Sequence, residues 1–299
     1  MNPKYPIYII SKGRWESRLT VKALEKINVP YYVVVEKQEY KQYTAVIDPN
    51  KVLILPKKYL QEYDIFDDAI GKGNGPGPGA ARNFCWDHSI KAGFKWHWVM
   101  DDNITGFYRL NDNLKVQVAS GTIFKCAEEF INRYINVGIA GFNYFMFASR
   151  KSKILPYYLN TRIYSCLLIK NNIPYRWRGR YNEDTDLSLR ALKDGLCTVL
   201  FNAFLCYKLT TQTIKGGNSE AFYDKEGTLN KSKMQVKMHP DVSKLVWKFN
   251  RWHHHVDYSQ FKKNKLIKKP GIKIKQGVDN YGMLLVKYNS KTGKYKIKK

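Results

Sequence analysis

Two acids and an amide stand where the sequence predicts the end of a strand. Asp101 and Asp102, followed by Asn103, come directly after the apolar run Lys95–Met100, which predicts a buried strand. Carboxylate and amide oxygens are ligands that suit Mg²⁺ or Mn²⁺, and these cations also bind phosphate oxygens. Because ligands bind α/β sheets beyond the carboxyl ends of the strands, the position favours metal or ligand binding. The alternative is an ordinary turn, where Asp and Asn are common.

A second group of acids stands at the start of a predicted helix. Glu183, Asp184 and Asp186 fill the first turn of a stretch with helical spacing that ends at Gly195. Acids favour a helix N-terminus and glycine favours its end, so one interpretation is a simple helix start. Three arginines alternating with aromatic residues come just before it: Arg176, Trp177, Arg178, Arg180 and Tyr181. Arginines beside carboxylates suit a site that grips phosphate while it keeps the acids ionised.

Two further motifs are less specific. The glycine- and proline-rich stretch 71–79 opens into a predicted helix over 80–92, and such a loop can cradle phosphates with backbone N–H groups. Its spacing matches neither a P-loop nor a dinucleotide fingerprint, which favours a surface loop. His253, His254 and His255 are consecutive, so they cannot all face one metal in regular structure. A histidine pair near an acid or a phosphate is the alternative.

The first half of the chain alternates strand-like and helix-like segments. The predicted strands are 5–10, 31–35, 52–55 and 95–100, and the predicted helices are 16–27, 39–46 and 80–92. This alternation with short connections predicts an α/β fold with a parallel sheet covered by helices. The second half adds predicted strands at 138–147, 162–169, 197–201 and 204–209, a loop over 210–238 and a helix over 242–249.

Composition narrows the class of protein. The 299 residues carry a formal net charge of +26 and include 22 Tyr, 14 Phe and 7 Trp, which are too many aromatic residues for a disordered chain. No apolar stretch approaches the roughly 20 residues of a membrane span, and the N-terminus lacks a signal-peptide pattern. The five cysteines are odd in number and lack metal-binding spacing, so we expect a reducing, cytoplasmic compartment, that of the host cell if the protein is viral.

The charge predicts a polyanionic partner, and nucleic acid is the first choice before a membrane surface or no such partner. Residues 262–299 hold 13 Lys and one acid, Asp279, so the other residues keep a net charge of +14. The basic character therefore belongs to the body as well as to the tail. We expect one main domain over 1–261 and a lysine-rich extension over 262–299, with a β-hairpin around 289–293 that packs on the main domain.

Together the two acidic groups resemble those of GT-A glycosyltransferases, which place an acidic motif after a central strand and a later acid as general base. Three further motifs sharpen the likeness: Ser11-Lys12-Gly13-Arg14, Gly79-Ala80-Ala81-Arg82-Asn83 and Arg251–Tyr258. With these the chain resembles the TET/JBP-associated glycosyltransferases over about residues 5–265. That group includes bacteriophage enzymes proposed to glycosylate hydroxymethylated bases in DNA. The resemblance implies a GT-A-like, Rossmann-like mixed sheet flanked by helices, with the small basic extension outside it.

The resemblance implies roles around the donor, a UDP-sugar. Ser11 and Arg14, with Glu36 at the end of the second strand, would border the nucleotide base. Arg82 and Asn83 would orient the diphosphate or the donor sugar.

It also implies a divalent cation, Mn²⁺ or Mg²⁺. Asp101 would contact the ribose, Asp102 would coordinate the metal and Asn103 would support it. Asn103 stands where the common acidic pattern has a second Asp, which leaves the ligand open between Asp102 and Asn103. His239 is a candidate for a further contact with the metal or with phosphate.

On the acceptor side, Asp184 would be the general base and Glu183 would lie beside it. The residues expected to contact DNA are Arg176, Trp177, Arg178 and Arg180. For the aromatic residues, core packing is the equal alternative to stacking on a displaced base.

The sequence thus predicts a metal-dependent, inverting glycosyltransferase that moves a hexose or pentose from a UDP-sugar to a hydroxymethylpyrimidine in DNA, with 5-hydroxymethylcytosine as the first choice. A glycosyltransferase with a saccharide or protein acceptor would leave the net charge unexplained. A non-catalytic DNA-binding module on a degenerate scaffold is the alternative from another class. No membrane or protein partner is expected.

Overall fold

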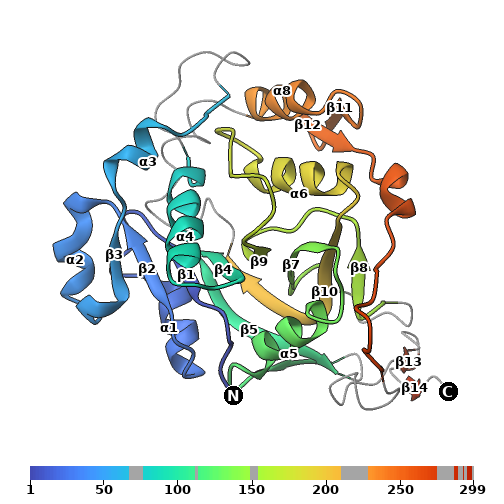
Figure 1. Cartoon of the computed structure of the whole chain (residues 1–299), viewed down its shortest axis with the longest axis horizontal. Helices are drawn as coiled ribbons and strands as arrows, with labels where there is room; N and C mark the ends of the chain where they lie inside the picture. The colour runs from blue at the N-terminus through green and yellow to red at the C-terminus, as the bar shows by residue number, and fades with distance from the viewer. Residues whose placement is uncertain are drawn as a thin grey trace.

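The computed structural model has one large mixed sheet with helices on both faces (Figure 1). The structure describes residues 1–66, 77–111, 114–148, 154–209, 228–274, 286–288, 292 and 295–297. Parts of three sequence predictions lie outside the described residues: the glycine–proline loop at 71–76, the long loop at 210–227 and the tail turn at 289–291.

Four parallel strands form one half of the sheet. They are β1 (Ile7–Ile10), β2 (Tyr32–Val35), β3 (Val52–Ile54) and β4 (Trp96–Asp101), in the order β3-β2-β1-β4. The helices along this part of the chain are α1 (Leu19–Lys26), α2 (Tyr40–Thr44), α3 (Lys57–Gln61) and α4 (Gly79–Lys91), with 3₁₀ turns at Lys37–Glu39 and Pro49–Lys51. The predicted parallel α/β arrangement of the first half is confirmed. Because parallel strands end at one edge, the residues after β1, β2 and β4 meet there.

The sheet changes direction beside β4. The strand β9 (Cys166–Lys170) pairs antiparallel with β4 and with β7 (Val137–Tyr144), and β10 (Cys197–Lys208) runs parallel to β7. The remaining strands pair antiparallel: β5 (Ile104–Asn111) and β8 (Tyr157–Leu159) with β10, and β6 (Leu114–Gln117) with β5. The fold is therefore a mixed α/β sheet flanked by helices.

Successive side chains in a strand point to opposite sides of the sheet. Both sides are buried here because helices pack on each of them. In β1, Ile9 packs in one apolar cluster and its neighbour Tyr8 packs in the other. The first cluster includes residues of α1 and α5 (Thr122–Ile131), and the second includes residues of α4 and α6 (Glu183–Lys193). Both α4 and α6 begin beside the end of β4, because Arg82 in the first turn of α4 contacts Asp101 at that strand end and Glu183 at the start of α6.

The helix predicted over 242–249 is wrong. Instead, β11 (Ser243–Lys248) pairs antiparallel with β12 (Arg251–Val256), and Phe249 and Asn250 form the two-residue turn between them. A short apolar run is ambiguous between helix and strand, and here the tight turn and the cross-strand pairing decide for the strand.

The loop predicted over 210–238 is wrong for its last part, because residues Leu229–Met238 form α8. Met234 and Met238 are spaced one turn apart and pack against Tyr181. The apolar stripe is short and lies among lysines and polar residues, so its periodicity is weak in the sequence. In Figure 1, α8 and the β11–β12 hairpin lie together beside α6.

Beyond residue 261 the chain continues along the main sheet domain. After a 3₁₀ turn at Ser259–Lys263, the backbone N–H of Ile135 donates to Ile267 at 2.9 Å, and that of Lys269 donates to Arg133 at 2.8 Å. The short strands β13 (Val286–Tyr288) and β14 (Tyr295–Ile297) pair antiparallel. All five cysteines are buried and unpaired. In the described ranges, no helix combines the length and apolar character that a bilayer span needs.

One buried carboxylate fastens the N-terminus to the sheet. Glu128 of α5 accepts hydrogen bonds from the backbone N–H groups of Lys4 and Tyr5, at 2.7 and 3.2 Å, and from Trp98 Nε1 at 2.9 Å. We predict that Glu128→Ala lowers the free energy of unfolding by about 2–4 kcal/mol, because three donors lose their acceptor. Urea unfolding measures this. Its neighbour Glu129, half exposed, is the matched control, and an equal loss in Glu129→Ala would contradict the assignment.

Candidate active site

A cavity of about 730 Å³ opens beyond the carboxyl ends of β1, β2 and β4. Its volume lies within the range of about 300–1,000 Å³ that is typical of ligand sites. Most of the residues predicted from the sequence line it: Ser11, Arg14, Glu36, Arg82, Asp101, Asp102, Asn103, Glu183 and Asp184. The structure thus brings together residues that are distant in the chain at the edge where α/β proteins bind ligands.

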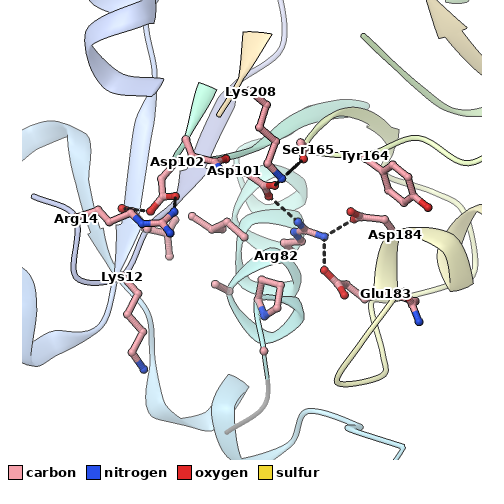
Figure 2. Close-up of a pocket in the computed structure, with 18 of the residues that line it drawn as sticks. Lys12, Arg14, Arg82, Asp101, Asp102, Tyr164, Ser165, Glu183, Asp184 and Lys208 are labelled. Carbon is pink, nitrogen blue, oxygen red and sulfur yellow. Dashed lines mark hydrogen bonds and ion pairs between the residues drawn. The ribbon is translucent and has the colours of Figure 1, made fainter. Parts of the chain in front are cut away.

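Arg82 is the centre of this site. Its Nη2 lies 2.9 Å from Asp101, its Nη1 lies 3.0 Å from Glu183, and the same Nη1 pairs with Asp184 (Figure 2). The side chain is only 3% exposed, and the guanidinium lies 4.6 Å from the centre of the Trp177 ring. One buried cation therefore joins the first turn of α4, the end of β4 and the start of α6.

Asp101 has a second cation. Lys208 Nζ lies 2.7 Å from its Oδ2, Ser165 Oγ donates to the same oxygen at 2.6 Å, and Lys208 also contacts Ser165 Oγ at 2.8 Å. Burial favours the protonated acid, but Lys208 and Arg82 outweigh it and hold the pKa of Asp101 well below its usual value. Asp101 is therefore ionised throughout the physiological pH range.

Asp102 faces the other side of the cavity, toward β1. It pairs with Arg14 and accepts a hydrogen bond from Ser11 Oγ at 2.7 Å. Burial raises the pKa of Asp102, although the Arg14 guanidinium opposes the shift. The neighbouring Asn103 is buried, and its amide donates to the carbonyl of Leu209 at 3.0 Å, which ties the end of β4 to the segment after β10.

Asp184 has a pKa that is raised to near neutral pH. Burial raises its pKa from 3.8 to about 7; Arg82 opposes this, and Glu183 and Asp101 add to it by repulsion. The folded protein thus holds a proton that the unfolded chain has already released. Asp184 consequently lowers stability as the pH rises from about 4 to about 7, and near neutrality it changes between acid and base.

The residues predicted to hold a metal do not lie together. Asp102 lines the cavity, but His239 does not: its Nε2 lies 2.9 Å from Asp186, and its Nδ1 lies 3.1 Å from Lys193 Nζ. Within the described ranges, no group of three or more His, Cys, Asp or Glu side chains could hold a metal ion. Asp101 and Asp102 are both engaged by cationic side chains, and an ammonium next to Asp101 repels a divalent ion. As they lie, these residues do not fit Mn²⁺ or Mg²⁺.

The residues predicted to contact DNA do not line the cavity either. Arg176 lies 3.3 Å from Asp87 at the surface, Arg178 lies 3.1 Å from Asp186, and Arg180 is buried. Trp177 is 1% exposed, so it is a core residue rather than a stacking platform.

Asn83 holds the backbone of Trp177 in place through two hydrogen bonds. Its amide donates to the Trp177 carbonyl at 3.0 Å and accepts from the Trp177 backbone N–H at 2.8 Å. Asn83 does not line the cavity, and it positions the Trp177 ring beneath Arg82.

Several residues that line the cavity were given no role from the sequence: Lys12, Arg162, Tyr164, Ser165, Lys208 and Lys231. Lys208 could have been predicted from the sequence, because it ends the strand β10 as Asp101 ends β4. The others lie in loops and helices, where nothing in residue type or spacing distinguishes them from other surface residues.

Comparison with known proteins shows which protein family the chain belongs to. The model of the TET-associated glycosyltransferase family matches residues 5–217, which is most of the chain, and the chain belongs to this family. The match confirms the resemblance and ends before the motif at 251–258. It gives the activity as that of a glycosyltransferase.

No curated protein matches the chain. Among solved structures, the crystal structure of mannose-6-phosphate isomerase from Helicobacter pylori is similar at 10% identity, over 89% of this chain and 94% of that one. The TM-score is 0.24, and a likeness at that level carries no argument.

We predict that Arg82→Met destabilises the protein by about 3–5 kcal/mol at pH 8, because three buried carboxylates lose their shared cation. The loss should shrink at pH 5, where the acids of the variant take up protons in the folded state. Urea unfolding at the two pH values measures both effects. Arg176→Met is the control, since that exposed pair should contribute at most about 1 kcal/mol at either pH. A loss independent of pH would contradict the electrostatic origin.

Proposed function

We propose that this glycosyltransferase moves a sugar from a UDP-sugar to the hydroxymethyl group of a modified pyrimidine in DNA, with 5-hydroxymethylcytosine as the first choice. The observation that carries the proposal is Asp184, an acid with a pKa of about 7 that faces a cavity at the edge of a parallel sheet. A general base works best when its pKa lies near the working pH.

The reaction needs one proton transfer and one displacement. Asp184 accepts the proton of the hydroxymethyl group as the oxygen attacks the anomeric carbon of the sugar. The bond from that carbon to the diphosphate oxygen breaks, and UDP leaves with the electron pair. Attack from the face opposite the leaving group inverts the anomeric centre. Glu183 keeps Arg82 oriented toward Asp184, because both acids share the same guanidinium nitrogen.

Side-chain cations support the diphosphate in this proposal. Basic residues outnumber acids along the cavity: Lys12, Arg14, Arg82, Arg162, Lys208, Lys231 and Arg251 against Glu36, Asp101, Asp102, Glu183 and Asp184. Such cations offset the charge that develops on the departing diphosphate. Ser11 and Glu36, on the far side of the cavity from Asp184, are the proposed contacts of the nucleoside. A divalent cation at Asp102, which the resemblance implied, is not part of this proposal, because Arg14 already pairs with that carboxylate.

The net charge of +26 supports DNA as the acceptor. A glycosyltransferase with a saccharide or protein acceptor would use the same cavity but would have no need of this charge. A non-catalytic DNA-binding module would not need an acid with a raised pKa at the cavity wall. Release of UDP that depends on hydroxymethylated DNA, and not on the same DNA with methyl groups, supports the proposal. Equal release with both DNAs would contradict it.

We predict that Asp184→Asn slows transfer by about 10²-fold or more while UDP affinity changes little, because only the base is lost. In the wild type, the rate should fall as the pH drops through about 7, since protonated Asp184 cannot accept the proton. Steady-state kinetics and calorimetry measure the two quantities. Glu183→Gln is the matched variant: if it is inactive while Asp184→Asn turns over normally, the base is Glu183.

We also predict that Lys208→Met weakens UDP binding by about tenfold or more, the scale of losing a hydrogen bond to a charged group. In the wild type, UDP should bind equally well with a chelator present, because side chains supply the counter-charge. Calorimetry with and without EDTA measures both. Lys12→Met, at a lysine 60% exposed at the cavity rim, should have a smaller effect. Binding that is lost in EDTA and restored by Mn²⁺ would show that a metal is needed.

A further inference from the structure

The β11–β12 hairpin exposes large aromatic side chains. Trp247 is 58% exposed, Phe249 is 87% exposed and Trp252 is 39% exposed. Trp247 and Trp252 are cross-strand partners with ring centres 5.3 Å apart, and Phe249 stands at the tip. Clustered apolar exposure of this kind marks an interaction site.

The backbone at the tip is also unusual. Phe249 and Asn250 have φ angles of 53° and 55°, so both adopt the left-handed conformation of a type I′ turn. Asn tolerates this conformation, but a bulky aromatic residue there is strained. Phe249 therefore combines two unfavourable features, a strained backbone conformation and an aromatic ring exposed to solvent. Such a combination at one residue is typical of a functional position rather than of packing.

The hairpin stands at the rim of the cavity. Arg251 and His253 of β12 line the same cavity as Asp184. Lys248 and Arg251 are cross-strand partners next to the turn, so both lie on one face of the hairpin, immediately behind Phe249. An aromatic tip flanked by basic residues fits a nucleic acid, in which bases offer stacking surfaces and phosphates offer negative charge.

We propose that this hairpin is a DNA wedge: Phe249 inserts into the base stack beside the target, and Lys248 and Arg251 hold the neighbouring phosphates. The inference rests on the proposed function, and it supplies a step which that function needs. A base within a duplex must leave the stack to reach an enzyme cavity, and inserted apolar side chains partly unstack DNA. Trp177 and Tyr181, the aromatic residues that the sequence suggested for this role, are buried.

The direct test is base unstacking without catalysis. A duplex carries 2-aminopurine beside the hydroxymethylated pyrimidine, and its fluorescence is recorded as protein is added in the absence of donor. The wild type should increase the fluorescence, and Phe249→Asn should abolish most of the increase. Because Asn favours the left-handed turn, the melting temperature of this variant should stay equal or rise, which separates wedging from folding. Phe94→Ala, at an exposed aromatic residue beyond the far end of α4, is the control.

Transfer kinetics give the second readout. Phe249→Asn should reduce transfer to duplex DNA by about tenfold or more, the scale of one base–aromatic stacking contact, but leave transfer to a single strand unchanged. If the wild type transfers no sugar to any DNA and yet unstacks the duplex, the proposed function fails and the wedge stands. Wild-type fluorescence that stays flat would overturn the wedge, as would a variant that matches the wild type on duplex DNA.

A membrane surface is the competing partner for exposed tryptophans among basic residues. Vesicles of phosphatidylcholine with phosphatidylglycerol test it through the tryptophan emission of the wild type. A blue shift with these vesicles, lost in Phe249→Asn and accompanied by no 2-aminopurine response, would replace the wedge with a membrane contact.

Discussion

The site depends on one buried guanidinium. Arg82 pairs with Asp101, Glu183 and Asp184, and these acids come from a strand end and a helix start that are far apart in the chain. Without a shared cation, three carboxylates could not be buried so closely, because each would repel the others. The cation thereby fixes where α4 and α6 begin relative to β4. The Trp177 ring packs against the Arg82 guanidinium, and Asn83 holds the Trp177 backbone through two hydrogen bonds.

This arrangement divides the acids by function. Asp101, held by both Arg82 and Lys208, stays ionised, whereas Asp184 shares Arg82 with Glu183 and keeps a pKa of about 7. Neighbouring acids with separated pKa values are typical of catalytic sites. The basic residues along the whole cavity outnumber its acids, and this excess of positive charge favours a diphosphate. The change from parallel to antiparallel pairing beside β4 places Ser165 and Lys208 against Asp101 at the same edge.

The sequence predicted what periodicity and strand ends can show. The four parallel strands, with Asp101 and Asp102 at the end of one of them, follow from apolar runs that end in polar residues. The family resemblance, and not the pattern of residues, predicted that Ser11 and Glu36 belong to the same site. Partners could not be predicted, because pairing depends on packing between distant segments. For this reason the contacts of Arg178 and His239 with Asp186, which does not line the cavity, were not predicted. Lys208 was not predicted as a site residue either. The β11–β12 hairpin was hidden because its turn is Phe-Asn, without the glycine that usually signals such a turn.

The most direct test of the proposed function is to find which molecule carries the transferred sugar. Duplex DNA with hydroxymethylcytosine is incubated with the wild-type protein and a panel of UDP-sugars, digested to nucleosides and analysed by mass spectrometry. We expect a hydroxymethylated nucleoside that has gained one sugar residue, and no change in matched DNA that carries methylcytosine. UDP release without any sugar on the nucleosides, or sugar found only on an added saccharide or protein acceptor, would contradict the proposed function.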